Sequence, residues 1–211
     1  QKEVSQSPTV LSNISGPIEG LKAGLDAFLA DTQNRTFLMR LPQLLCASTS
    51  QMDHKRVNAL MVYIASHALA RMQKSQTLSR TPEVEIVMRL MECDDRSRYI
   101  CLSAIANQLR YPSSHTHYFS CLMLYIFSES ASLVVKEQVT RVLLERLIVN
   151  RPHPWGLLVT FVELIKNQRY NFWSFPFTRC ATEIEKVFES VARSCMPPGT
   201  QRGAVVGGEE S

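Results

Sequence analysis

Histidines, paired acids and cysteines are the residues of this 211-residue chain that could do chemistry, and their spacing argues against it. His115 and His117 are two positions apart, and on a helix such residues point about 200° apart, so they cannot bind one metal ion together. Asp94 and Asp95 lie at a helix boundary, where acids ordinarily act as caps. None of the six cysteines has the Cys-x-x-Cys spacing of zinc or redox sites. We therefore expect no catalytic residue, no metal site and no enzymatic activity.

Glycine is missing from the whole stretch between Leu25 and Trp155. Without glycine this stretch cannot contain either of the loops that cradle nucleotide phosphates. We therefore expect no cofactor and no small-molecule substrate. The longest uncharged run covers residues 111–128, and its apolar core, 118–127, is too short to span a bilayer. The sequence accordingly predicts no membrane contact.

Aromatic side chains outside clean helical stripes are the most informative candidates for function. Apolar anchors of partner peptides dock into pockets built from such residues. The other interpretation is that these side chains form satellite core under a loop, and the sequence leaves both open. The candidates for partner binding are Tyr111, His115, Tyr118, Trp155, Tyr170, Phe172, Trp173, Phe175 and Phe177.

Helical periodicity determines the elements that must position these side chains. Thr81 and Pro82 form a strong helix start, with a cap followed by proline at the first helical position. Residues 118–127 are apolar on nearly every face of a helix, which predicts a helix buried on all sides. Residues 155–165 form a second nearly all-apolar helix. Pro42 is expected to kink or split the helix that contains it.

The rhythm of apolar stripes and breaks predicts an all-α fold, a HEAT-like stack of about nine antiparallel helices. No sequence repeat of fixed period supports the stack, so the prediction depends on the succession of helices alone. Asp53, Asp94 and Ser113 or Ser114 are expected helix caps, and Lys136 is expected on a solvated face. We expect a flexible leader over residues 1–15, a single domain over 16–196 and a disordered tail over 197–211. The predicted helices begin near residues 17, 37, 53, 82, 95, 115, 133, 155 and 182.

Basic residues are dispersed along the chain, and the formal net charge is +4. Such residues usually form a solvated surface, but they recur near predicted helix ends and could line one edge of a helical stack. A helical domain that binds RNA directly along this edge is therefore the alternative function. A helical hydrolase has the least support, because no catalytic constellation is present.

Long stretches of the sequence resemble a known family. They include AIANQLRYP (104–112) with SHTHYFSC (114–121), VTRVLLERLIVNRPHPWGLL (139–158), EIEK (183–186) and VARSC (191–195). On these residues the chain resembles the C-terminal domain of the large scaffold subunit of the CCR–NOT mRNA deadenylase complex. The likeness is nearly continuous from about residue 98 to 195 and looser over 37–72. The sequence departs from the family pattern in the Glu92–Asp95 segment and near residues 75–80.

The resemblance implies a HEAT-like scaffold domain without enzymatic activity. In that family the domain docks the Not-two and Not-three (or Not-five) subunits and receives short motifs of RNA-binding repressors such as Nanos. It thereby supports mRNA deadenylation, decay and translational repression, with only indirect association with mRNA. The expected location is the cytoplasm, P-bodies included, and the nucleus. The family gives no contact residues, so the site prediction depends on the aromatic side chains alone.

Overall fold

The computed structural model describes residues 21–33, 35–46, 51–72, 78–79, 81–150 and 152–179, with the single residues 186, 190 and 193. Within these ranges the chain forms eight α-helices, three short 3-10 turns and no strand beyond an isolated bridge between Cys46 and Met52. The predicted all-helical stack is therefore confirmed. The predicted leader and tail, the helix start at Gly16-Pro17 and the helix expected from Thr182 lie outside the described residues.

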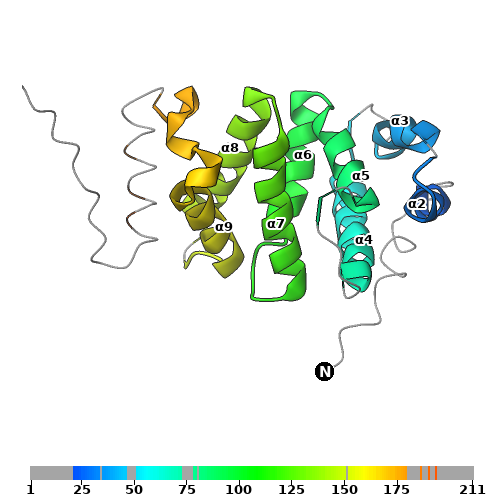
Figure 1. The fold of residues 1–211 in the computed structure, drawn as a ribbon, viewed down its shortest axis with the longest axis horizontal. Coiled ribbons are helices and arrows are strands. Elements are labelled where there is room, and N and C mark those ends of the chain that lie inside the picture. Colours follow the sequence, from blue (N-terminus) through cyan, green and yellow to red (C-terminus); the bar gives the residue numbers. More distant parts are fainter. Residues whose placement is uncertain are drawn as a thin grey trace, which may run out of the picture.

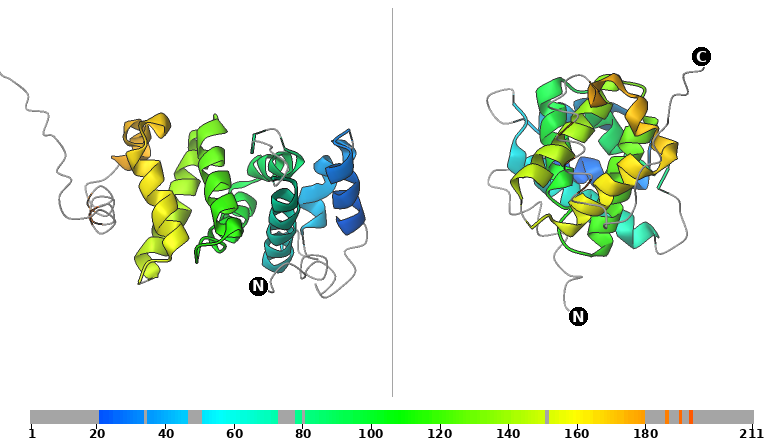
Figure 2. Two further views of the ribbon diagram at one scale, coloured as in Figure 1. Left: turned by 60° about the horizontal axis from the view of Figure 1, so that its bottom comes forward. Right: turned by 90° about the vertical axis from the view of Figure 1, so that its left-hand side faces the viewer.

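The helices follow one another along the long axis of the molecule, from α2 and α3 at one end to α9 at the other (Figures 1 and 2). Helix α4 packs on α5, α6 and α7, while α7 also packs on α8 and α9. The 3-10 turns lie against α9 at the end of this row. The α-helices are α2 (Leu21–Ala30), α3 (Arg35–Leu44), α4 (His54–Met72), α5 (Pro82–Met91), α6 (Asp95–Ala106), α7 (Ser114–Glu129), α8 (Leu133–Val149) and α9 (Trp155–Lys166), and the turns are η1 (Gln168–Tyr170), η2 (Phe172–Ser174) and η3 (Pro176–Thr178).

Side-chain caps define the helix starts, as the sequence predicts. The Asp53 carboxylate accepts hydrogen bonds from the first amides of α4, with the Lys55 N–H at 2.7 Å. Thr81 caps α5, and Asp94 accepts the amides of Arg96 and Ser97, both at 3.1 Å, at the start of α6. Ser113 caps α7 through the Thr116 N–H at 3.1 Å. These bonds satisfy amides that have no partner inside the helix.

Helix α3 differs from the prediction at its proline. Pro42 lies inside α3, which runs unbroken from Arg35 to Leu44. The proline is two residues from the end of the helix, and the bond that it cannot make and the crowding by its ring concern a single carbonyl, that of Leu38. Of the kink or split expected at Pro42, the split does not occur.

Helix α7 forms the centre of the core. Phe119, Leu122, Met123, Ile126 and Phe127 are all fully buried. The helix touches α4, α6, α8 and α9, and Figure 1 shows it in front of α6 and α8. Burial on several sides explains why its apolar residues follow no single stripe.

Helix α9 is less buried than its apolar composition predicts. Trp155 and Val159 expose 47% and 41% of their surface, whereas Leu157, Phe161 and Leu164 are buried. Helix α9 lies toward one end of the described stack, where helices pack on one side of it only. The expectation of a second central helix is therefore corrected: α9 keeps one apolar face uncovered by the described residues.

Lys136 is not a solvated side chain. Its Nζ donates to the carbonyl oxygens of Phe127 and, at 3.3 Å, of Ser128, which belong to the last turn of α7. The ammonium group also lies 4.9 Å from the centre of the Phe127 ring and 5.5 Å from that of Phe175. Partial burial lowers the pKa of this amine. Lys136 therefore joins α8 to the C-terminal end of α7, where the helix dipole favours a cation.

We expect Lys136→Ala to lower the free energy of unfolding by about 1 kcal/mol, because carbonyls bonded to a charged group lose their donor. Lys136→Met, which keeps the aliphatic stem, should recover little of this loss. The control is Glu137→Ala on the exposed side of the same helix, with a change below about 0.5 kcal/mol. Urea denaturation of the three variants measures the difference. Equal losses for Lys136→Ala and Glu137→Ala would contradict the role in joining the helices.

Candidate functional site

A pocket of about 540 Å³ opens where the α6–α7 loop, the end of α8 and the start of α9 meet. Its lining combines two exposed rings with charged, amide and apolar side chains. Tyr111 exposes 79% and Trp155 47% of its surface, whereas Ala106 and Leu157 are buried. The lining residues are Ala106, Asn107, Arg110, Tyr111, Arg146, Asn150, Pro152, His153, Pro154, Trp155 and Leu157.

Backbone hydrogen bonds fix the pocket wall. The Gly156 N–H donates to the Arg110 carbonyl oxygen at 3.2 Å, and the Leu157 N–H donates to that of Leu109 at 3.1 Å. These amides belong to the first turn of α9, where no carbonyl of the same helix can accept them. A Cβ on Gly156 would lie 2.8 Å from the Leu109 carbonyl carbon, so only glycine allows this approach. The start of α9 and the loop that carries Tyr111 are thereby held together.

Two arginines are held at the pocket by hydrogen bonds to the α6–α7 region. Arg146 donates to the Ser103 carbonyl oxygen at 3.1 Å and to Asn107 Oδ1 at 3.0 Å. The Nε of Arg110 donates to the Asn107 carbonyl oxygen at 3.2 Å. Each of these bonds uses one nitrogen of a guanidinium group that has five N–H donors. Both groups therefore have further donors in the pocket.

His153 contributes an imidazole whose tautomer the structure defines. Its Nδ1 lies 3.0 Å from the Asn150 carbonyl oxygen, which can only accept, so Nδ1 carries the proton. In that tautomer Nε2 is a hydrogen-bond acceptor. The flanking prolines, Pro152 and Pro154, restrict the backbone of this loop.

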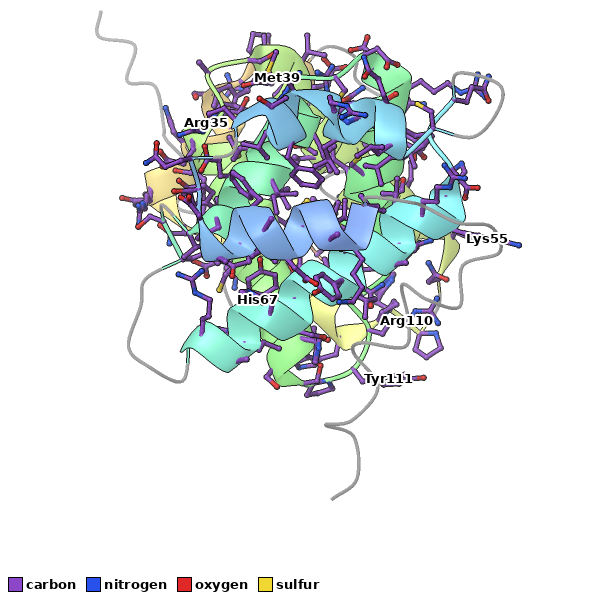
Figure 3. The ribbon with its side chains drawn as sticks, turned by 90° about the vertical axis from the view of Figure 1, so that its right-hand side faces the viewer. Arg35, Met39, Lys55, His67, Arg110 and Tyr111 are labelled. Carbon is purple, nitrogen blue, oxygen red and sulfur yellow. The ribbon has the colours of Figure 1, made fainter. Side chains whose placement is uncertain are left out.

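Tyr111 and Trp155 are the two predicted site residues that this pocket brings together. They are far apart in the sequence and meet because α9 returns to the α6–α7 loop. Figure 3 shows Arg110 and Tyr111 beside each other at the rim of the molecule, on the opposite side from Arg35 and Met39. His115 is exposed in the first turn of α7 and does not line the pocket.

Tyr118 and Phe172 belong to the core, and the expectation that they contact a partner is corrected. Tyr118 exposes 1% and Phe172 2% of its surface. Desolvation raises the pKa of the Tyr118 hydroxyl, as expected for a phenol kept neutral inside the protein. Both rings pack against neighbouring phenylalanines, Tyr118 on Phe119 and Phe172 on Phe161.

The other rings from 170 to 177 form a half-buried cluster on the ends of α7 and α9. Phe175 and Phe177 stack with ring centres 5.5 Å apart, and Phe127 contacts Phe175 edge to face. Trp173 donates its indole N–H to the Ile165 carbonyl oxygen at 3.0 Å. Of the two interpretations that the sequence left open, this packing favours satellite core. For residues 170–177 the sequence predicts a loop or one short helical turn, and the structure has three 3-10 turns here.

Tyr170 differs from these rings because it lines a second pocket, of about 740 Å³, beside α7. Desolvation raises the pKa of its hydroxyl and also that of the Cys121 thiol in the same wall. These raised pKa values favour the neutral phenol and the neutral thiol in this pocket. Its walls comprise Leu78, Ser79, Cys121, Leu124, Tyr125, Ser128, Glu129, Arg169 and Tyr170.

Sequence reasoning missed the polar half of the first pocket. Arg146 and Asn150 are four positions apart, which places them on one face of a helix, and this spacing was the available signal. Asn107 and Arg110 lie next to the predicted Tyr111, but nothing in the sequence shows that α8 faces them.

The described residues contain no cluster of three or more metal-ligating side chains and no helix that is both long and apolar enough to cross a membrane.

Several arginines that could have formed a basic edge instead donate hydrogen bonds to backbone carbonyl oxygens of the protein. Arg56 donates to the Cys46 carbonyl oxygen at 2.6 Å and to that of Leu44 at 3.3 Å. Arg98 is only 8% exposed and donates at 3.0 Å to the carbonyl oxygens of Met91 and Cys93. Other arginines pair with acids, as in the pairs Arg89–Glu92, Arg141–Glu145 and Arg35–Glu85. The acidic partners offset the charge of Arg89, Arg141 and Arg35, which weakens a continuous basic edge.

Comparison with protein families and curated proteins identifies relatives of the whole helical region. A family model described as the CCR4-Not complex component Not1 matches residues 1–192. The chain is 43% identical over 189 residues to the CCR4-NOT transcription complex subunit let-711 of Caenorhabditis elegans, covering 85% of this chain and 7% of that protein. It is 39% identical over 211 residues to the general negative regulator of transcription subunit 1 of Schizosaccharomyces pombe, covering 94% and 10%. The chain thus spans a tenth or less of these relatives.

Solved structures share the fold. The NOT1 superfamily homology domain from Chaetomium thermophilum matches with a TM-score of 0.72 and 28% identity, over 81% of this chain and 35% of that one. A Not1 C-terminal domain solved in complex with Not4 matches with a TM-score of 0.69 and 23% identity, over 82% and 38%. At that identity the second likeness shows the fold alone.

Proposed function

Because the chain belongs to the Not1 family of CCR4-Not complex components, we propose that it is a non-enzymatic docking domain of that complex. In this proposal it binds the Not-two and Not-three (or Not-five) subunits and short motifs of RNA-binding repressors such as Nanos. Docking would support mRNA deadenylation, decay and translational repression, in the cytoplasm and in the nucleus.

The observation that carries the proposal is the pocket with two exposed rings at its rim. Exposed Tyr and Trp side chains over a buried apolar floor are typical of sites that receive the anchor residues of extended peptides. The floor is formed by Ala106 and Leu157, and the α9–loop hydrogen bonds hold the rim in place. The solved Not1 C-terminal domain in complex with Not4 supports docking of a complex subunit on this fold.

Direct RNA binding is the competing function, and salt distinguishes the two. Binding to phosphates releases counterions, so affinity for RNA falls steeply between 50 and 200 mM salt. Docking of apolar peptide anchors changes little over the same range. The test is co-purification of the chain with the Not-two/Not-three pair at both salt concentrations, beside an RNA-binding titration. Complex formation that survives high salt supports the docking function, and failure of the pair to bind contradicts it.

The paired substitution Tyr111→Ala with Trp155→Ala is expected to weaken binding of the Not-two/Not-three pair at least tenfold, about 1.4 kcal/mol. The reason is that a few aromatic residues usually supply most of the binding energy. Tyr111 exposes 79% and Trp155 47% of its surface, so the melting temperature should fall less than it would for a substitution in the core. Isothermal titration calorimetry and a thermal melt on the same preparation measure both quantities.

The matched control removes an exposed apolar side chain elsewhere. Met39 on α3 exposes 63% of its surface and lies across the molecule from Tyr111 (Figure 3). Met39→Ala should leave both the affinity and the melting temperature unchanged. If the Tyr111/Trp155 variant binds the pair as tightly as the wild type, docking takes place elsewhere on the stack. The second pocket, lined by Tyr170, is then the next candidate.

A further inference from the structure

The charge of the Tyr111/Trp155 pocket is one-sided. Arg110 and Arg146 both line it, and none of its described lining residues is Asp or Glu. His153 adds an imidazole whose Nδ1 bonds the Asn150 carbonyl oxygen. The amides of Asn107 and Asn150 also belong to the lining, although neither carries charge. The rim thus offers apolar rings beside donors that favour an anion.

We propose that this pocket binds an extended acidic peptide segment, with an aromatic or aliphatic anchor against Tyr111 and Trp155 and an adjacent Asp or Glu paired with Arg110. This inference deepens the proposed docking function and rests on it. Arg110 is the expected partner because its Nε is already held by the Asn107 carbonyl oxygen, which leaves the terminal nitrogens for a carboxylate. A pre-positioned guanidinium loses less conformational freedom when the pair forms.

Arg146 contributes positive charge to the pocket but is not the expected partner of the carboxylate. One of its terminal nitrogens already bonds the Ser103 carbonyl oxygen and Asn107 Oδ1. It therefore adds positive potential to the pocket while holding α8 to the end of α6. Removing it would disturb the fold as well as the charge, so Arg110 is the residue to test.

A peptide fits the site better than single-stranded RNA does. Strand-binding proteins combine stacking rings with a basic groove that follows successive phosphates. Here two arginines, Arg110 and Arg146, line one pocket of about 540 Å³. The nearby Arg141 is paired with Glu145 at 2.7 Å and so does not extend a basic track along α8. A compact cationic pocket with two rings matches one anchor and its acidic neighbour.

Selection from a random peptide library tests the proposed chemistry without assuming a sequence. Phage that display random dodecapeptides are selected on the 211-residue chain and then depleted on the same chain carrying Trp155→Ala. We expect the retained peptides to be enriched in Asp or Glu within a few positions of Phe, Trp or Leu. Retained peptides with no acidic bias, or no peptide that depends on Trp155, would overturn the proposal.

A charge exchange then identifies the arginine. The strongest selected peptide, labelled with fluorescein, should bind Arg110→Glu at least about tenfold more weakly than the wild type, because attraction becomes repulsion. The same peptide with its acids replaced by lysine should bind Arg110→Glu more tightly than it binds the wild type. Arg40→Glu, at an exposed arginine of α3, is the control and should change affinity by less than about twofold. Equal effects of Arg40→Glu and Arg110→Glu would contradict a specific pair.

Further outcomes separate this inference from the proposed function. If the Not-two/Not-three pair binds the chain but is insensitive to Arg110→Glu and Trp155→Ala, the acidic-peptide site is wrong and the docking function stands. If the pair does not bind the chain at all, the docking function fails. A fluorescein-labelled oligouridylate that binds in a Tyr111-dependent and salt-sensitive way would instead assign the pocket to RNA.

Discussion

Phe127→Ala is expected to lower the free energy of unfolding by about 3–5 kcal/mol, a range typical of a buried phenylalanine cut back to alanine. Phe127 is fully buried near the end of α7. Its ring contacts those of Tyr170, Phe172 and Phe175, with centres 6.3, 6.2 and 5.6 Å away. The substitution removes the ring against which Tyr170 of η1, Phe172 of η2 and Phe175 pack, and it also removes the ring beneath the Lys136 ammonium group.

Urea denaturation measures this loss, and indole fluorescence shows where it occurs. The chain has two tryptophans, so a Trp155→Phe background leaves Trp173 as the only reporter. We expect its emission to shift to the red in Phe127→Ala, because Trp173 packs on Phe172 in this cluster. Phe127→Leu keeps most of the apolar volume and should cost less, about 1–1.5 kcal/mol. A loss below about 1 kcal/mol for Phe127→Ala would show that the turns are not anchored on α7.

Gly156→Ala is expected to destabilise the protein by about 2–3 kcal/mol, although alanine favours helix over glycine by about 1 kcal/mol. The two effects have opposite signs, and geometry decides between them. The new Cβ would lie 2.5 Å from Thr116 Cγ2, 2.8 Å from the Leu109 carbonyl carbon and 3.0 Å from Leu109 Cα. Backbone cannot rotate away as a side chain can, so the start of α9 must move.

That movement would also damage the pocket. It would lengthen the hydrogen bonds from Gly156 to Arg110 and from Leu157 to Leu109, and it would displace Trp155 from Tyr111. Weaker binding of the Not-two/Not-three pair should therefore accompany the loss of stability. Thermal and urea denaturation measure the stability, and calorimetric titration below the melting transition measures the affinity.

Gly24→Ala is the matched control, since Gly24 is also a helical glycine near a close neighbour. Its Cβ would meet ring atoms of Phe37 at 2.4 and 2.5 Å. The ring belongs to a side chain that can tilt, so we expect a smaller loss than at Gly156. A stabilised Gly156→Ala variant, as helix propensity alone predicts, would show that α9 tolerates a shift away from Leu109.

The helices of this protein could be predicted from the sequence because their caps and apolar patterns are local signals. The caps Asp53, Thr81 and Asp94 act within three residues of their own position. Residues 118–127 are apolar on nearly every face of a helix, so contact along a single face could not bury them all. This pattern therefore identifies a helix that is buried on several sides. Such signals depend on neighbours in the sequence, so the all-helical stack and the capped starts of α4, α5 and α6 follow from the residues alone.

The candidate site follows only in part from the sequence. Tyr111 and Trp155 were found as rings outside helical stripes, but the same criterion also selected Tyr118 and Phe172, which are buried. A ring in a loop or at a helix start has the same local signature whether it faces solvent or core. The exposed fraction depends on which distant element covers it, and for Phe172 that element includes Phe127 and Phe161.

The sequence by itself determined the all-helical architecture and the family, because these depend on residue types, spacing and long runs of similar residues. Only the tertiary structure decided that Lys136 caps the end of α7 and that Arg110 and Arg146 share a pocket with Tyr111 and Trp155. The physical reason is that helix-forming interactions join residues a few positions apart. The pocket, in contrast, depends on the close approach of α9 to the Leu109 backbone, an approach set by packing between distant helices.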